Sequence, residues 1–278
     1  MKLDFNRIKA AIFDIDGTLI DSMPIWDDIS GEYLRGLGIT PDPNHADVIY
    51  SMTLSEGCEY TRKHYGLDKS AEEIEEDIVG MIRQFYYQEV KPKPGVEKML
   101  RTMKESGIAM ILATSGDEDL ASHALERLGF MPYFEELITC DSLATKKSET
   151  KIFEVAKTKL ENALGHELLT EEICVFEDSP VAVNTTKNAG YTVDGVADEA
   201  NVLSRKQIKE QSDYFYYSLE EAFGACICPV CKETAFEKDN SYEICPVCGW
   251  ENDKQQKNDP EYAGGANNLS LIQYIKER

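Results

Sequence analysis

Short β-rich apolar runs alternate with longer amphipathic stretches along most of this chain, and this alternation limits the fold more than any other feature. The runs expected to form strands span residues 10–15, 108–113, 137–140, 173–176 and 191–195. Helical spacing fills the intervals at residues 95–106, 119–128, 150–162 and 180–189. Strands that alternate with helices build a parallel sheet covered on both faces, so we expect a Rossmann-like, doubly wound α/β fold.

One long interval breaks the alternation. Between residues 20 and 92 there is no strand pattern, and apolar side chains such as Ile74, Ile78 and Phe85 follow helical spacing instead. Proline-containing junctions bracket this interval, as expected where one folding unit is inserted into another. We therefore expect an α-helical domain at residues 20–92, inserted into a core made of residues 1–19 and 93–224.

Charge and hydropathy exclude several classes of partner. The 278-residue chain carries a formal net charge of -22, which disfavours binding to nucleic acids or anionic membranes because both require clustered Lys and Arg. No run approaches the roughly 20 apolar residues of a membrane-spanning helix, and the first ten residues mix charged with apolar side chains. We therefore expect a cytoplasmic protein with neither nucleic-acid nor membrane partners.

Two carboxylates follow the apolar residues 10–13 at the end of the first predicted strand. Asp14 and Asp16 precede Gly17, which permits a tight turn. Side chains two positions apart in extended backbone point the same way, and ligand sites of open α/β sheets lie at the carboxyl edge of the strands. Because adjacent carboxylates repel each other, a bound cation is the simplest compensation, and Mg²⁺ prefers such oxygen ligands.

Later segments place further polar residues at strand ends or helix starts. Thr114 follows the second run directly, two lysines precede the helix at 150–162, and Asp178 follows the fourth run. In this order, with Asp14-x-Asp16-Gly-Thr first, the segments resemble the signatures of the haloacid dehalogenase-like hydrolases. The position of the helical insertion resembles the cap domain of the phosphatase and β-phosphoglucomutase-like subgroup.

The resemblance implies a role for each matching residue. Asp14 would attack phosphorus and form an aspartyl-phosphate, while Asp16 would protonate the leaving oxygen and later deprotonate the attacking water. Thr114 would hold a phosphate oxygen, with Ser115 adding a backbone N–H. Lys147 would neutralise the nucleophile and the phosphoryl group in a dry site.

The implied Mg²⁺ ligands come from the same signatures. They are Asp14, the backbone carbonyl of Asp16 and Asp178, with Glu177 beside them. Alignment on the Ile-Phe pair that follows the lysines selects Lys147 as the active-site lysine. The two prolines usual in this signature are absent, so Lys146 stays open as the alternative.

Cysteine pairs dominate the last part of the chain. Two knuckles, Cys228-x-x-Cys231 and Cys245-x-x-Cys248, are separated by 13 residues, a spacing that lets four thiolates surround one tetrahedral Zn²⁺. Cys226 lies too close to the first pair to be a natural ligand, and we expect a spare thiol there.

We expect residues 225–278 to form a zinc ribbon, and as a whole they resemble the bacterial cysteine-rich CPCC domain. A closed four-cysteine site is structural rather than catalytic, because it leaves no open position on the metal. The domain is acidic, so we expect it to serve a protein partner or self-association rather than nucleic acid. Trp250 is either an anchor for such a contact or a core residue packed against the knuckles, and packing is the favoured interpretation.

Three functions remain compatible with these features. The favoured one is a Mg²⁺-dependent phosphatase acting on a small phosphorylated metabolite. The second is a β-phosphoglucomutase-like sugar phosphomutase. Such enzymes often have a valine at the position of Thr18 and a cap arginine at the position of Leu54, so both residues of this chain favour hydrolysis. The third is a phosphate-sensing or protein-binding module acting through the zinc ribbon, although a pure binder does not need the general acid Asp16.

Overall fold

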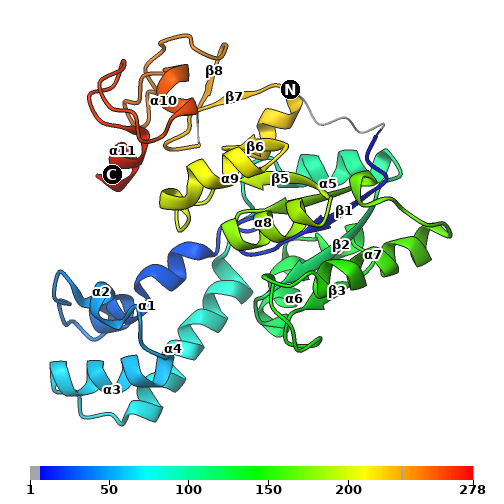
Figure 1. The fold of residues 1–278 in the computed structure, drawn as a ribbon. Helices are drawn as coiled ribbons and strands as arrows, with labels where there is room; N and C mark the ends of the chain where they lie inside the picture. Colours follow the sequence, from blue (N-terminus) through cyan, green and yellow to red (C-terminus); the bar gives the residue numbers. More distant parts are fainter. Residues whose placement is uncertain (1–6, 233, 278) are drawn as a thin grey trace. The chain divides into compact units, whose positions relative to one another are not determined.

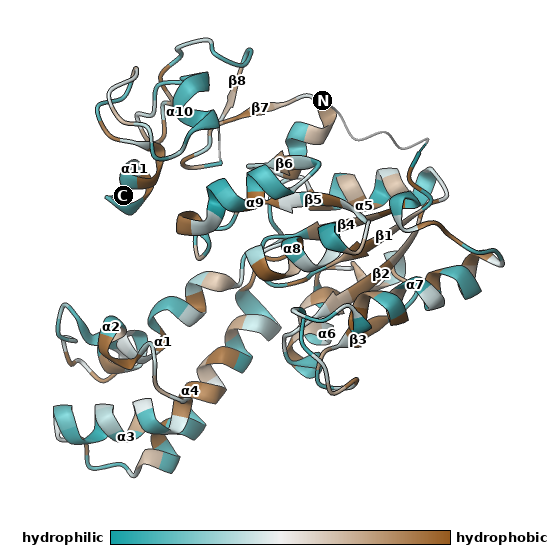
Figure 2. Cartoon of the chain, in the orientation of Figure 1, coloured by the Kyte–Doolittle hydropathy of each residue, from teal (hydrophilic) through white to brown (hydrophobic). Residues whose placement is uncertain are grey.

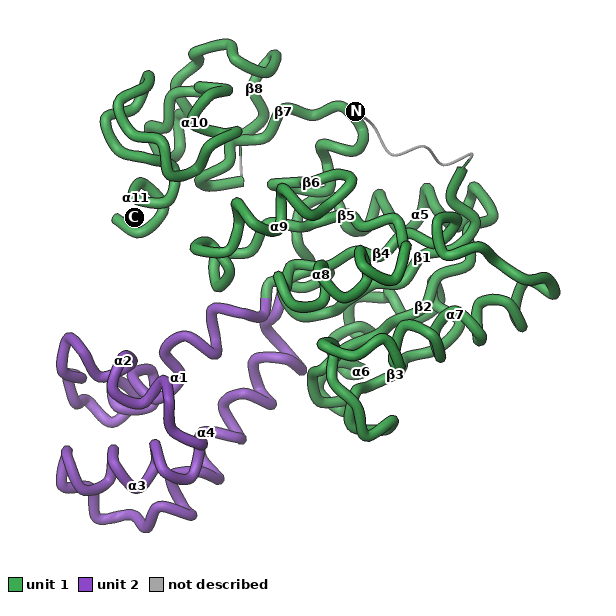
Figure 3. The backbone as a smooth tube through the Cα atoms, viewed as in Figure 1, with its two compact units in different colours: residues 1–21, 92–278 green, residues 22–91 purple. Residues whose placement is uncertain are grey.

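The insertion folds as a compact unit of its own. The computed structural model describes residues 7–232 and 234–277, and Figure 1 shows the helices and strands that they form. One unit joins the segment up to Asp21 with the segment from Pro92 onward, and residues 22–91 form the other, as Figure 3 shows.

A six-stranded parallel sheet forms the centre of the larger unit. In spatial order its strands are β3 (Leu137–Thr139), β2 (Ala109–Thr114), β1 (Ala10–Phe13), β4 (Ile173–Glu177), β5 (Thr192–Val196) and β6 (Tyr214–Tyr216). The central strands are buried along their whole length, as expected when helices cover both faces of a parallel sheet. The predicted α/β class is confirmed, whereas β6 was not predicted.

The flanking helices match the predicted intervals closely. They are α5 (Val96–Glu105), α6 (Glu118–Arg127), α7 (Lys151–Leu164), α8 (Pro180–Asn188) and the unpredicted α9 (Arg205–Gln211). Short 3-10 turns lie between elements at η2 (Met131–Tyr133), η3 (Thr170–Glu172), η4 (Val202–Ser204) and η5 (Leu219–Phe223). In Figure 2 the central strands are mostly brown and the outer sides of the helices mostly teal. Among the described residues, no helix combines the length and apolar character needed to cross a membrane.

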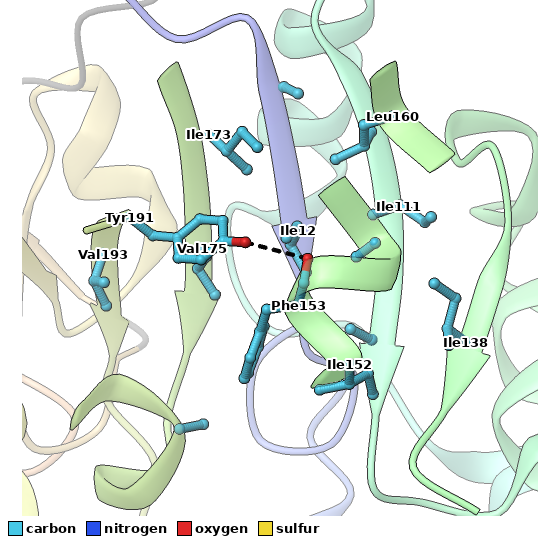
Figure 4. Packing of buried hydrophobic residues seen from close by; sticks show 14 of the residues in the cluster. Ile12, Ile111, Ile138, Ile152, Phe153, Leu160, Ile173, Val175, Tyr191 and Val193 are labelled. Carbon is cyan, nitrogen blue, oxygen red and sulfur yellow. Dashed lines mark hydrogen bonds between the residues drawn. The ribbon is translucent and has the colours of Figure 1, made fainter. Parts of the chain in front are cut away.

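The two faces of the sheet have separate cores. Ile12 and Val175 belong to the cluster that α7 and α8 cover, seen in Figure 4. Phe13, which points to the other face, stacks on Phe176 with ring centroids 4.3 Å apart. Within the first cluster the Tyr191 hydroxyl donates to the carbonyl of Phe153 at 3.2 Å, which holds the first turn of α7 against the sheet.

The smaller unit is helical, as the sequence predicted. Its elements are α1 (Met23–Gly36), α2 (His45–Ile49), α3 (Leu54–Tyr65), α4 (Ala71–Gln84) and the π-helical turn η1 (Phe85–Glu89). Thr53 caps α3 and Ser70 caps α4, each in a reciprocal capping box with the glutamate three residues later. Ile74, Ile78 and Ile82 form the buried stripe of α4.

The cysteine-rich segment packs around a small core that also includes Ala197 and Tyr217 of the larger unit. It contains an antiparallel pair, β7 (Cys226–Ile227) and β8 (Ala235–Phe236), and two short helices, α10 (Lys254–Asn258) and α11 (Leu271–Lys276). Trp250 is fully buried and packs edge-on against Tyr274. Trp250 is therefore a core residue, as the favoured interpretation held.

Candidate active site

The candidate site lies at the carboxyl edge of the three central strands β2, β1 and β4. Asp14 follows β1 directly, Thr114 ends β2, Glu177 ends β4 and Asp178 comes next. The N–H of Asp14 donates to the carbonyl of Phe176 at 3.1 Å and so extends the ladder by one residue. Parallel pairing thus brings together polar residues that are far apart in the sequence.

Lys147 lies between two of these carboxylates. Its ammonium donates to one oxygen of Asp14 and one oxygen of Glu177, and the residue is only 8% exposed. Lys146 is exposed to solvent. The loop before α7 therefore delivers Lys147, and not Lys146, to the carboxylates.

Asp178 is held through both of its carboxylate oxygens. The Thr18 hydroxyl donates to Oδ1 at 3.2 Å, and Asn201 Nδ2 donates to Oδ2 at 2.8 Å. Asp14, Glu177 and Asp178 each offer an oxygen, and these oxygens lie within 4.8 Å of one another. Three buried carboxylates thus converge on one point.

The electrostatics of this cluster fit a bound divalent cation. Burial raises the pKa of Asp178 well above its usual value, and Asp14 and Glu177 raise it further. Burial also raises the pKa of Glu177 to about 7, although Lys147 acts in the opposite direction. Burial alone would lower the pKa of Lys147, but Asp14 and Glu177 raise it above the ordinary value. One ammonium cannot neutralise this set, and carboxylate oxygens are the ligands that Mg²⁺ prefers.

Asp16 reaches the end of β2. Gly17 has a φ of 78° and turns the chain directly after it. A Cβ atom placed on Gly116 would lie 2.6 Å from Asp16 Oδ2 and 3.2 Å from the Thr114 hydroxyl oxygen, so all three lie side by side. The N–H of Gly116 donates to that hydroxyl oxygen at 2.9 Å, which leaves the Thr114 proton for a ligand. Ser115 is exposed.

A second buried lysine beside this site was not predicted. Lys93 donates to the carbonyl of Ala197 and to the Asp198 carboxylate, both at 2.7 Å, and also to the carbonyl of Gly17. Although burial would raise it, the pKa of Asp198 is held below its usual value by Lys93. The sequence signal was a lysine between two prolines, which indicated only a junction between domains.

The four cysteine sulfurs of the two knuckles also converge. Sγ of Cys228 lies 3.6 Å from that of Cys248, and Sγ of Cys231 lies 3.5 Å from that of Cys245. Four thiolates about 2.3 Å from a tetrahedral Zn²⁺ are about 3.8 Å apart, so the geometry and the donor atoms fit zinc. Cys226 is not part of this cluster among the described residues.

Comparison with protein families gives two matches along the chain. The haloacid dehalogenase-like hydrolase family matches residues 11–196, a range that contains all four signatures and the insertion. The chain belongs to this family. The cysteine-rich CPCC family matches residues 226–276, which cover both knuckles. The hydrolase therefore carries a C-terminal domain of the CPCC type.

Individual relatives agree with this membership. A phosphorylated carbohydrates phosphatase from Thermotoga maritima is 25% identical to the hydrolase over 183 residues, covering 66% of this chain and 82% of that protein. A phosphoglycolate phosphatase from Rhodobacter capsulatus is 30% identical over 188 residues, covering 65% and 80%. The solved structure of a candidate β-phosphoglucomutase from Thermotoga maritima has a TM-score of 0.66 at 24% identity, covering 77% and 96%. At that identity the likeness shows the fold alone.

Proposed function

We propose that this hydrolase is a Mg²⁺-dependent phosphatase that acts on a small phosphorylated metabolite through an aspartyl-phosphate. The observation that carries the proposal is the buried pair of Asp14 and Lys147, with Glu177 and Asp178 converging on it. The relatives named above as phosphatases support the same reaction class.

In the first half-reaction Asp14 is the nucleophile. A carboxylate oxygen of Asp14 forms a bond to phosphorus while the ester P–O bond breaks. Asp16, adjacent to the Thr114 hydroxyl, gives its proton to the leaving oxygen. Lys147 and Thr114 hold the phosphoryl oxygens, and the ammonium is effective because the site is buried.

In the second half-reaction Asp16 reverses its role. Its carboxylate, deprotonated by the first step, accepts a proton from water. The water oxygen forms a bond to phosphorus, and the bond from phosphorus to Asp14 breaks. Inorganic phosphate leaves, and both aspartates return to their starting protonation states.

The carboxylates that face this reaction centre would hold Mg²⁺. The proposed ligands are Asp14, Asp178 and the backbone carbonyl of Asp16, with Glu177 adjacent. When bound, Mg²⁺ neutralises phosphate charge and stabilises the charge that develops in phosphoryl transfer. Thr18 and Asn201 contribute by fixing the orientation of Asp178.

Helix α3 of the insertion favours hydrolysis over a mutase reaction. A sugar phosphomutase must hold the second phosphate of its substrate, which calls for a free cation. Leu54, at the position expected for that cation, begins α3 and is 40% exposed. Arg62 and Lys63 on the same helix both form ion pairs with Glu59.

The four cysteines are proposed to hold a structural Zn²⁺, whose binding would fold the knuckles. A cytoplasmic location stays a prediction, supported by the need of these cysteines for a reducing compartment. A protein partner or self-association through the ribbon also stays a prediction. Trp250 cannot anchor such a contact because it is buried.

The direct test is phosphate release by the purified protein, with and without Mg²⁺, against sugar phosphates, phosphoglycolate and nucleotides. We expect release from at least one class, dependent on Mg²⁺ and lost in Asp14→Asn. Asp141→Asn, which changes an exposed carboxylate, is the matched control and should keep the activity. Release that survives Asp14→Asn would contradict the proposed nucleophile.

A further inference from the structure

The loop of residues 197–201, which follows β5, supports the proposed metal site. At its end, Asn201 supplies the hydrogen bond to Oδ2 of Asp178, while Thr18 supplies the one to Oδ1. A carboxylate held at both oxygens keeps a single orientation. Asn201 is therefore placed to decide how Asp178 faces its neighbours Asp14 and Glu177.

The start of the 197–201 loop is fixed to the turn that follows the nucleophile. Lys93 donates to the Ala197 carbonyl and to the Asp198 carboxylate, and the same ammonium donates to the Gly17 carbonyl. Ala197 is also part of the buried cluster formed mainly by the cysteine-rich domain. Asn201, at the end of the loop, thus lies in the active site, and Ala197, at its start, packs against the ribbon.

The middle of the loop is bound by the ribbon itself. Lys232, the residue after Cys231 in the first knuckle, places its ammonium 2.9 Å from an oxygen of Glu199. The Lys232 side chain is 13% exposed and that of Glu199 is 39% exposed, so this ion pair is shielded from solvent on the lysine side only. Arg205 contacts the same oxygen at 3.8 Å.

The backbone of Lys232 gives an independent reason to assign its side chain a role. Lys232 has a φ of 60°, and Gly249, at the corresponding position of the second knuckle, has a φ of 78°. This left-handed region disfavours L side chains, and glycine is its usual occupant. The first knuckle thus accepts strain at a position where the second has none. A lysine there has an evident use in the contact with Glu199.

We propose that the zinc ribbon positions the active site: Lys232 holds Glu199, and through it the loop that presents Asn201 to Asp178. The inference rests on the proposed function in one respect, that Asp178 binds Mg²⁺. Lys232, Glu199 and Asn201 are positioning residues in this account, since each acts on the metal through another residue. Loss of any of them is expected to weaken Mg²⁺ binding more than it lowers kcat.

Expected magnitudes follow from how directly each residue acts. Removing a hydrogen-bond partner of a metal ligand typically weakens metal binding by about tenfold or more, which is the expectation for Asn201→Ala. Lys232→Gly and Glu199→Gln act one step further away, and we expect each to weaken Mg²⁺ binding about threefold. Because Lys232→Gly and Glu199→Gln break the same ion pair, the double variant should bind Mg²⁺ as tightly as the weaker of the two single variants.

The experiment measures Mg²⁺ binding to the full-length, zinc-loaded protein by titration calorimetry, together with the Mg²⁺ dependence of phosphate release. The variants are Lys232→Gly, Glu199→Gln, their combination and Asn201→Ala, each checked for zinc content. Lys206→Ala is the matched control. The Lys206 ammonium lies 3.4 Å from Glu261 of the ribbon, so it forms another ion pair between core and ribbon, but this pair does not involve the 197–201 loop. Glu199→Gln keeps the test valid if Lys232→Gly disturbs the knuckle.

The expected result is weaker Mg²⁺ binding in all loop and Lys232 variants, the stated non-additivity, and no change in Lys206→Ala. An active wild type whose Mg²⁺ binding is untouched by Glu199→Gln and Lys232→Gly would overturn the inference and leave the proposed function standing. A wild type that neither binds Mg²⁺ nor releases phosphate would overturn both. A change of equal size in Lys206→Ala would also overturn the inference, because the effect would then not pass through the loop.

Discussion

Gly116→Ala should disable the general acid while sparing the fold. A Cβ at this position would lie 2.6 Å from Asp16 Oδ2, closer than real Cβ contacts come. The nearest atom is the end of a side chain, so the carboxylate can rotate away, at a cost of about 1 kcal/mol for an off-rotamer side chain. Misplacing a general acid-base group costs about 10²-fold in rate or more. We therefore expect kcat to fall about 10²-fold, with a thermal midpoint lowered by only about 2–4 °C.

The assay compares kcat and thermal midpoint for wild type, Gly116→Ala, Asp16→Asn and the double variant. Because both changes act on one carboxylate, the double variant should be no slower than Asp16→Asn alone. Gly80→Ala is the control, since a Cβ there would meet no atom within 4 Å and the residue lies inside α4. A Gly116→Ala enzyme with wild-type kcat would refute the placement of Asp16, and severe unfolding would refute the idea that only the carboxylate moves.

Other predictions concern the core and the ribbon. Asp194 is fully buried beside Cys174 and Tyr216, and burial raises its pKa to about 8. The pKa of an aspartate in the unfolded chain is about 3.9. As the pH rises from about 4 to about 8, the free energy of unfolding should therefore fall by up to about 1.4 kcal/mol per pH unit, because the folded state holds a proton that the unfolded state has lost. Asp194→Asn should flatten this dependence in thermal melts, and parallel curves would contradict the assignment. Cys245→Ser should abolish zinc retention, measured by elemental analysis, and lower the thermal midpoint; full zinc content would contradict the site. Phe153→Ala should destabilise the fold by about 3–5 kcal/mol in denaturant titrations, and a loss under 1 kcal/mol would contradict its role in the core.

The strands that the sequence predicted best are the central ones, β1, β2 and β4, which are buried along their whole length. Runs such as the one containing Ile12 have no polar residue to interrupt them, so β1, β2 and β4 overlap their predicted ranges closely. β6 was missed because Tyr214–Tyr216 is short and partly exposed. Its pairing with β5 depends on the tertiary contact and not on a local pattern.

The site was predictable where its residues sit in local signatures at strand ends. Asp14 comes directly after an apolar run and Asp178 one residue after another, and parallel pairing of the two strands brings them together. The pattern favoured Lys147 but left Lys146 open, because only the folded loop buries one of the two lysines. Lys93 and Asn201 belong to no signature, and they reach their partners across 76 and 23 residues of sequence.

The most direct test of the account is the search for phosphate covalently bound to Asp14. The protein is mixed with Mg²⁺ and a substrate that it hydrolyses, quenched in acid within the first turnover, and digested for mass spectrometry. The account predicts an acid-stable, base-labile phosphoryl group on the peptide that contains Asp14, and none in Asp14→Asn. Substrate turnover without any phosphorylated Asp14 peptide would contradict it.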